Sequence, residues 1–460
     1  GHRIPAWYNE TGAYVVCKTM EEAQKLFAEK GLSYANITQD EDVLDTWASS
    51  WLWPISVFNG FKENQSKDIA YYYPTDVLVT APEILFFWVA RMIIAGYYYR
   101  HEKPFKHVYL TGIVRDKQRR KMSKSLGNSP DPLDLITQYG ADGVRMGMLL
   151  MAPAGNDILF DEKQVEQGRN FSNKLWNVFR LISGWEIKNE HNSANTPAIE
   201  WFASKLSETI KTVDVHFENY RVSDALMLLY SFVWDDFCSW YLEFIKPAFG
   251  EPIDADTYNQ TITFFEDILK LLHPFMPFIT EELYHALKER SEGDDIIVAA
   301  YPEAKECPGT AEAGEFAKTL ISGVRDARSK NQLSPKEALP LYCHTISPVW
   351  EQFIPLVKKV ANLQAIQTVT DTPENAITFI AGKEKFYIAI NKALDAAQER
   401  KKLDEQLQYH IGFLRSVEAK LMNEKFIQNA PQSVIDAENR KKQDALDKIR
   451  MLENALARLG

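Results

Sequence analysis

The sequence contains few cysteines and no arrangement of them that would bind a metal. Its four cysteines, Cys17, Cys238, Cys307 and Cys343, are far apart, have no CxxC spacing, and bring no nearby histidine that would complete a zinc site. This pattern excludes a zinc finger and a disulfide framework. We therefore predict no metal site and a reducing, cytoplasmic compartment.

Long apolar runs are missing as well. The most hydrophobic stretch, 84–99, contains Arg91 and is too short to span a bilayer, so we predict a buried helix and no membrane association. Residues 1–5 lack the basic and then apolar layout of a signal peptide. They are typical of a segment inside a longer protein.

Charge is unevenly distributed along an acidic chain. The formal net charge of −11 argues against indiscriminate coating of nucleic acid. Between positions 100 and 125, however, nine Lys/Arg stand against two Asp/Glu, a local balance of +7. We therefore expect a polyanion to bind near this stretch.

Hydrophobic periodicity predicts three folded domains before the C-terminal segment. Over 1–162, β-rich runs (such as 76–80 and 107–112) alternate with helical ones, which is typical of an α/β domain with parallel strands. Over 163–333, apolar residues recur at helical spacing and predict an all-α helical bundle. Over 334–393, short strands at 339–343, 376–380 and 385–390 indicate a small mixed α/β junction domain.

The last segment, 394–460, has a heptad pattern in two parts. The first seam consists of Leu403, Leu407, His410, Leu414, Val417 and Leu421, and the second of Ala445, Ile449, Leu452, Leu456 and Leu459. Asn429, Ala430 and Pro431 interrupt the pattern, so we predict an antiparallel coiled-coil hairpin that projects as an arm. A dimerisation coiled coil is the alternative, but a self-paired hairpin has used its seam internally, and we expect a monomer.

The stretch 121–128, KMSKSLGN, carries the chemistry. Lys121 and Lys124 can place two ammonium groups on one polyphosphate, where negative charge builds as pyrophosphate leaves an attacked α-phosphate. Gly127 and the small serines allow the loop to approach a ligand closely and to move. A solvated basic turn is the other interpretation of such a short motif.

This loop and its surroundings resemble the valyl-tRNA synthetases, a family of class I aminoacyl-tRNA synthetases. Besides KMSKS, the resemblance lies in DVLDTWASS (42–50), YPTDVLVT (73–80), FFWVARM (86–92), TGIVRD (111–116), PLDLITQYG (132–140), NFSNKLW (170–176) and LHPFMPFITEE (272–282). It extends over the whole chain. Isoleucyl and leucyl relatives share KMSKS, so the valyl assignment depends mainly on DTWASS and on the hairpin.

The resemblance implies roles for particular residues. ATP would bind at Lys121, Met122, Ser123, Lys124 and Ser125, with the two lysines catalytic and Mg2+ as cofactor. Trp47, Ile84 and Trp88 would line an apolar valine pocket, although ordinary core packing also explains such residues. Thr80 and Glu83 would lie near the adenylate. Ala48, Ala81 and Glu83 depart from the residues usual in the family, phenylalanine, glycine and aspartate, which puts contacts from positions 81 and 83 in doubt.

The resemblance also implies that tRNA(Val) binds to the later domains. The helical region would bind the anticodon, yet Trp176, Trp234, Trp240 and Tyr241 are more typical of core than of base stacking. Arg325, Arg328 and Lys330 would meet phosphate or water. The arm would bind tRNA through its compact basic cluster, Arg440, Lys441 and Lys442.

The first signature of the class, HxGH, is missing, because no two of the nine histidines have that spacing. The editing domain would also lie before residue 1. We therefore expect this chain by itself to bind tRNA without aminoacylating it. An isoleucyl- or leucyl-tRNA synthetase and a non-catalytic tRNA-binding scaffold remain the alternatives.

Overall fold

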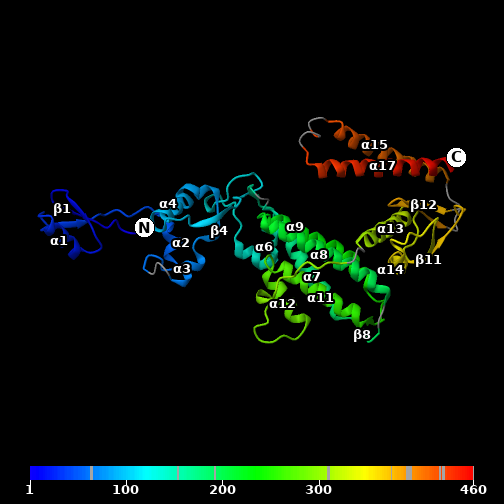
Figure 1. Cartoon of the computed structure of the whole chain (residues 1–460), viewed down its shortest axis with the longest axis horizontal. Coiled ribbons are helices and arrows are strands. Elements are labelled where there is room, and N and C mark those ends of the chain that lie inside the picture. The colour runs from blue at the N-terminus through cyan, green and yellow to red at the C-terminus, as the bar shows by residue number, and fades with distance from the viewer. Residues whose placement is uncertain are drawn as a thin grey trace. The chain divides into compact units, whose positions relative to one another are not determined.

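The structure is a computed structural model and describes residues 1–62, 66–152, 155–190, 193–307, 311–374, 376–389, 396–423, 426 and 430–458 (Figure 1). It forms two compact units. The first comprises 1–135, 147–165 and 219–223, and the second comprises 136–146, 166–218 and 224–460. The predicted mixture of helix and sheet is confirmed.

A small antiparallel sheet opens the first unit. Strand β1 (Ala6–Asn9) lies between β2 (Tyr14–Val16) and β3 (Ile37–Gln39), and helix α1 (Met20–Glu29) packs against them. The shared core consists of Trp7, Val15, Ala23 and Phe27. Helix α1 begins after Thr19, whose side chain accepts a hydrogen bond from the Glu22 backbone N–H and so caps the helix.

A parallel strand pair forms the centre of the first unit. Strand β4 (Thr75–Thr80) pairs in parallel with β5 (Phe105–Leu110), as the alternation of strands and helices predicts. The connection runs through η2 (Pro82–Ile84), a π-helical turn η3 (Leu85–Val89) and α4 (Ala90–Arg100). The remaining short elements are η1 (Ser50–Leu52), α2 (Trp53–Ser56), α3 (Lys67–Tyr72), β6 (Val114–Arg115), η4 (Lys124–Leu126) and β7 (Ile158–Leu159).

The prediction of a buried helix over 84–99 was wrong for one of its faces. Val89 and Met92 are buried against Leu78 and Phe105, but Phe86 and Tyr98 are exposed. The side chains of a helix point outward on all sides of its axis. A helix that packs against strands on one side therefore buries only the stripe of side chains that faces them, even when the other sides are also apolar.

The second unit consists mainly of helices. The residues of α5 (Pro132–Tyr139) and α6 (Ala141–Leu150) are divided between the two units. The other helices of the second unit are α7 (Glu162–Ser183), α8 (Thr196–Glu218), α9 (Val222–Ser231), η6 (Phe232–Tyr241), α10 (Leu242–Ile245), α11 (Ala255–Leu272), α12 (Pro277–Leu287) and α13 (Ala311–Lys330). Three further short helices are η5 (Ser193–Asn195), η7 (Ile296–Val298) and η8 (Glu351–Phe353), and β8 (Ile187–Lys188) pairs with β9 (Ile253–Asp254). Segment η6 is π-helical, and its buried residues include Phe237 and Tyr241.

A four-stranded sheet follows the helices. Its order is β11-β10-β13-β12, in which β10 (Leu339–Cys343) pairs in parallel with β11 (Leu363–Thr368) and antiparallel with β13 (Glu384–Ala389). Strand β12 (Ala376–Ala381) completes it, and α14 (Ile354–Val360) connects β10 to β11.

Two long helices end the chain and lie side by side in Figure 1. Helix α15 (Ala396–Leu421) and α17 (Gln432–Arg458) share an apolar cluster of Leu403, Leu407, Leu452 and Ala455. The helices run antiparallel, because the Lys442–Glu418 ion pair joins the end of one to the start of the other. Asn429 and Leu459 lie outside the described residues. No helix within the described ranges is long and apolar enough to cross a membrane.

Candidate functional site: the KMSKS loop and its surroundings

The KMSKS loop belongs to the first unit and follows a tight turn. Its first residue, Lys121, forms an isolated antiparallel bridge with Arg115 at the end of β6, and Arg119 takes a left-handed conformation (φ 64°) between them. The loop then forms one short helical turn from Lys124 to Leu126, and Gly127 (φ 61°) reverses the chain. Glycine suits this last position because it tolerates a positive φ at little cost.

Asn128 holds the two ends of the loop together. Its side-chain oxygen accepts a hydrogen bond from the Ser123 backbone N–H (3.0 Å). Its side-chain nitrogen donates to Asp116 Oδ2 (3.0 Å) and to the Lys121 carbonyl (3.4 Å). These hydrogen bonds hold the loop against the turn that precedes it.

Asp116 is the acceptor at the centre of this turn. It accepts hydrogen bonds from the Asn128 side chain, from the backbone N–H groups of Gln118 and Arg120, and from the Arg120 guanidinium. The Asn128 hydrogen bond is the first cause that holds the pKa of Asp116 far below its usual range, together with those from Arg120. Asp116 therefore stays ionised at physiological pH.

Loss of the Asn128 amide should loosen the loop selectively. We expect Asn128→Ala to raise amide hydrogen exchange over 121–128 about tenfold or more, because two or three hydrogen bonds of about 1 kcal/mol each are removed. Thermal unfolding of the whole chain should change little. Exchange measured by mass spectrometry tests this, and Ser125→Ala is the matched control, because the one hydrogen bond of its hydroxyl among the described residues is with Ser123 Oγ (3.1 Å). Equal exchange in the two variants would contradict the role of Asn128.

Lys121 is paired across the site with Glu83. The Lys121 Nζ lies 2.6 Å from Glu83 Oε2, and both side chains are about half exposed (59% and 46%). An ion pair with this much exposure to water contributes between nothing and about 1 kcal/mol. A polyphosphate that offers several charges can therefore compete for Lys121 easily.

Much of the basic stretch 100–125 is already neutralised. At least five of its nine Lys/Arg form ion pairs among the described residues, namely Lys106–Asp76, Arg115–Asp157, Lys117–Asp161, Arg120–Asp116 and Lys121–Glu83. The local excess of positive charge is therefore smaller than the sequence indicates. In all but one of these pairs the Asp or Glu lies outside 100–125. A count of charges within the stretch therefore does not include these acidic residues.

The predicted valine-pocket residues lie on two adjoining segments. Trp88 on η3 donates its indole N–H to the Ser50 carbonyl (3.1 Å), and the Ser50 hydroxyl donates to the Trp47 carbonyl (3.1 Å). Trp47 stacks on Phe87 with ring centres 6.4 Å apart. Trp47, Trp88 and Ile84 are each partly buried, so their side chains are neither sealed in a core nor free in solvent.

Thr80 is unusual at the end of β4. It is buried, with 6% of its surface exposed, and its carbonyl accepts hydrogen bonds from Thr111. Its hydroxyl, however, has no hydrogen-bond partner in the part of the chain that the structure describes. A buried hydroxyl without a partner is costly, and a bound ligand commonly supplies what is missing.

The aromatic and basic residues that were considered for tRNA binding differ in how far they are buried in the helical region. Tyr241 is fully buried and bonds Thr261 Oγ1 (2.9 Å), whereas Trp176 is 38% exposed. Arg325 lies over the ring of Trp240 at 5.5 Å. The placement of Arg328 in solvent or on phosphate was wrong, because this residue is 5% exposed and its guanidinium donates to four backbone carbonyls.

The basic cluster of the arm is partly paired. Lys441 lies 2.7 Å from Glu438, and Lys442 lies 3.0 Å from Glu418 on the other helix. Arg440 is exposed. Of the three, Arg440 is therefore the most available cation for a phosphate.

Sequence reasoning missed how Asp116 and Asn128 hold the loop, and it missed the Glu83–Lys121 pair. The signal for Asn128 was present, since it is the polar residue directly after Gly127 in the stretch 121–128. The Glu83–Lys121 pair joins positions 38 apart, and no local pattern indicates it.

Comparison with known proteins places these features in one family. Residues 1–161 match the model described as "tRNA synthetases class I (I, L, M and V)", residues 200–343 match "Anticodon-binding domain of tRNA ligase", and residues 395–460 match "Valyl tRNA synthetase tRNA binding arm". A leucyl-tRNA synthetase in a solved ternary complex with tRNA, from Agrobacterium radiobacter, covers 74% of the chain at 15% identity, with a TM-score of 0.49.

Curated relatives match the chain from end to end. The valine–tRNA ligase of Christiangramia forsetii is 49% identical over 100% of this chain and 54% of its own length. That of Phocaeicola vulgatus is 50% identical over 100% of this chain and 53% of its own length. The chain thus belongs to the family of the valine–tRNA ligases and spans about half the length of the curated relatives it matches.

Proposed function

We propose that this chain supplies the KMSKS side of the active site and the tRNA-binding parts of a valine–tRNA ligase. In the complete protein, valine and ATP would form valyl-adenylate, and the valyl group would pass to tRNA(Val). The observation that supports this most is the identity of about half of the residues with valine–tRNA ligases along the entire chain.

The loop suits the first chemical step. The carboxylate of valine attacks the α-phosphate of ATP, the bond from that phosphorus to the bridging oxygen breaks, and pyrophosphate leaves with the electrons. Lys121 and Lys124 would stabilise the charge that grows on the departing oxygens, with Met122, Ser123 and Ser125 shaping the loop around them. Cations placed where charge develops lower the barrier more than they tighten substrate binding.

Before ATP binds, the Glu83 carboxylate would pair with Lys121 in the place that the phosphates take later. Because its ion pair with Lys121 is exposed, the pair restrains the lysine only weakly and yields to the stronger charge of a triphosphate. Mg2+ would enter with ATP through phosphate oxygens and water. The nearby Asp116 is already engaged by four hydrogen bonds and is poorly suited to ligate it.

The substrates would bind beside the end of β4. The Thr80 hydroxyl has no partner in the described structure and lies close in sequence to Glu83, which supports an adenylate contact there. Trp47, Ile84 and Trp88 would form the apolar walls against the valine side chain. Such a pocket excludes larger side chains by clash but rejects a smaller or isosteric one poorly.

The remaining chain would bind tRNA as three successive parts. We propose 163–333 as the anticodon-binding bundle, 334–393 as a junction domain and 394–460 as a coiled-coil arm, after a catalytic segment over 1–162. The apolar seam between α15 and α17 is used internally, which supports a monomer. The four cysteines are free thiols, which supports the cytoplasm as the compartment.

A pyrophosphate-exchange panel tests the assignment. The complete protein should exchange ATP with pyrophosphate in the presence of valine, and much more slowly with isoleucine or leucine. A preference for isoleucine or leucine would move the protein to a sibling ligase. No exchange with any amino acid, together with tight tRNA binding, would favour the non-catalytic scaffold.

The arm should bind tRNA mainly through Arg440. We expect Arg440→Ala to weaken tRNA(Val) binding and to lower the slope of log K against log salt by about 1, because one phosphate contact is lost. Lys442→Ala should change that slope less, because Lys442 is paired with Glu418. Filter binding at four salt concentrations measures both. An unchanged slope for Arg440→Ala would exclude it from the interface.

A further inference from the structure

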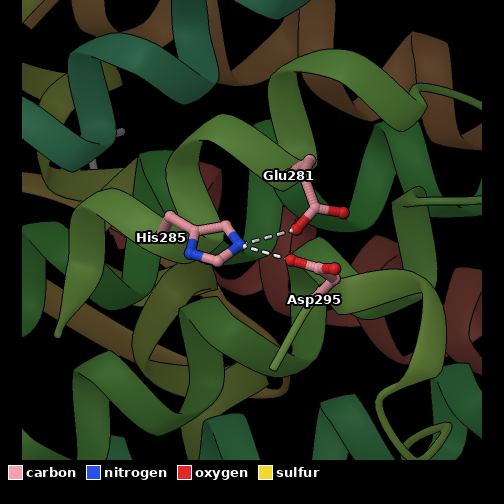
Figure 2. A group of neighbouring side chains, drawn as sticks. All are labelled: Glu281, His285 and Asp295. Carbon is pink, nitrogen blue, oxygen red and sulfur yellow. Dashed lines mark hydrogen bonds and ion pairs between the residues drawn. The ribbon is translucent and has the colours of Figure 1, made fainter. Parts of the chain in front are cut away.

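One group of three potential metal ligands lies in the second unit, far in sequence from the KMSKS loop. Among the residues that the structure describes, Glu281, His285 and Asp295 each direct a ligand atom into the same space, and these atoms all lie within 4.8 Å of one another (Figure 2). The His285 Nε2 is 3.0 Å from Glu281 Oε1 and 3.1 Å from Asp295 Oδ1. We propose that this group binds a zinc ion.

The distances suit a metal as well as they suit a proton. Two ligands that each lie about 2.1 Å from one Zn2+, at angles between a right angle and the tetrahedral value, are about 3.0 to 3.4 Å apart. Both separations from His285 Nε2 fall in this range. A single N–H can be shared between two oxygens only in a three-centre bond that is bent toward each of them, whereas a metal ion accepts both carboxylates as ligands.

Helix α12 carries two of the three proposed ligands, Glu281 and His285. Glu281 and His285 are four residues apart on α12, so their side chains share one face of the helix. The start of this helix is held in place by Asp142, whose carboxylate accepts the backbone N–H groups of Phe278 (3.3 Å) and Ile279 (2.6 Å). The two ligands therefore extend from a fixed support.

The third ligand is held by contacts that do not involve its own side chain. The backbone N–H of Ile296, the next residue, donates to Glu281 Oε1 (3.1 Å). The preceding residue, Asp294, is engaged by Arg290 (3.4 Å) and by the Tyr284 hydroxyl (3.3 Å). These contacts leave the Asp295 carboxylate directed at His285, as Figure 2 shows.

The surroundings leave room for a further ligand. A pocket of about 440 Å³ is lined by Glu281 and His285 and also by His273, Glu282, Phe278 and Ile297. His285 is 42% exposed and Asp295 is 51% exposed, so the ion would retain contact with water. One imidazole, two carboxylates and an open position form a donor set that Zn2+ accepts, because it takes both nitrogen and oxygen ligands. The ion would tie α12 to the segment that leads into η7.

Stoichiometric titration of the 460-residue chain tests the site. After removal of metal with a chelator, we expect one equivalent of Co2+ to give visible d–d absorption and Zn2+ to displace it. His285→Gln and Asp295→Asn should each weaken Zn2+ binding by about tenfold or more in competition with a chromophoric chelator. His273→Gln, which changes a histidine of the same pocket outside the group, is the matched control and should bind as the parent does.

A lysine substitution separates a metal site from a simple ion pair. His285→Lys places a positive charge between the two carboxylates but offers a poor ligand, so it should preserve the melting temperature of the metal-free chain while losing Zn2+ binding. Failure of the parent chain to bind one equivalent, or equal loss in His273→Gln and His285→Gln, would overturn the proposal. Because the readout is metal binding, neither result depends on the ligase assignment.

Discussion

In the complete protein, Lys124→Ala is expected to slow valine-dependent ATP–pyrophosphate exchange by about two to three orders of magnitude, the usual cost of removing one group that stabilises transition-state charge. Because Lys124 would act on the departing pyrophosphate, the loss should appear mainly in kcat, with a smaller change in KM for ATP. Steady-state exchange at saturating valine, with ATP varied, separates these two quantities.

The matched control for this prediction is Lys117→Ala. Lys117 belongs to the same basic stretch and pairs with Asp161 at 3.1 Å, yet it lies outside the KMSKS motif and is 70% exposed. Its loss should leave exchange within about twofold, because a surface ion pair contributes little. If both variants lost activity equally, general positive charge would account for the effect. If Lys124→Ala exchanged as fast as the parent, the role proposed for the loop would have to be abandoned.

Glu83→Gln tests the role of the ion pair between Glu83 and Lys121 before ATP binds. Removing the carboxylate that faces Lys121 at 2.6 Å leaves this lysine without its partner before ATP arrives. If Glu83 only occupies the place of the phosphates, ATP should bind no more weakly in the variant than in the parent. A large loss of kcat would instead assign Glu83 a direct part in forming the adenylate.

Local patterns predicted the loop and several of the strands, because both depend on neighbouring residues. Strand β10 was predicted at its observed bounds, Leu339–Cys343, since alternate side chains there are buried, as the period of a strand requires. Strand β11 (Leu363–Thr368) was missed because only its first residue is buried, so its apolar side chains give no such period. The π-helical segment Phe232–Tyr241 was likewise not anticipated, because its apolar stripe also fits an ordinary helix.

The candidate site could be predicted only in part, because several of its residues pair with partners that are distant in sequence. The charge of 100–125 could be counted, but its neutralisation by Asp76, Glu83, Asp157 and Asp161 depends on the fold. The group of Glu281, His285 and Asp295 was not anticipated for a related reason. Two of its three members are carboxylates, and Asp295 is ten residues from His285, so the group does not follow the cysteine and histidine spacings that identify a site from sequence.

Arg328 shows most clearly what the fold decides. Arg325, Arg328 and Lys330 lie close together near the end of α13 and look alike in the sequence, yet Arg325 is exposed and Arg328 is not. The Arg328 guanidinium donates to the carbonyls of Ser334 (2.7 Å) and Glu337 (2.8 Å), directly after the helix, and to those of Asn362 (2.8 Å) and Ala361 (3.4 Å), before β11. It therefore joins the end of α13 to two segments of the sheet region.

We expect Arg328→Met to lower the free energy of unfolding by about 3 to 4 kcal/mol, because methionine fills the space but leaves several buried carbonyls without a donor. Calorimetry of the chain should show the loss in the transition that includes the four-stranded sheet. Arg325→Met, on the same helix, should cost no more than about 1 kcal/mol, the worth of its contact with Trp240. If Arg328→Met instead weakened tRNA binding while the melting temperature stayed unchanged, a phosphate contact rather than a structural one would be its role.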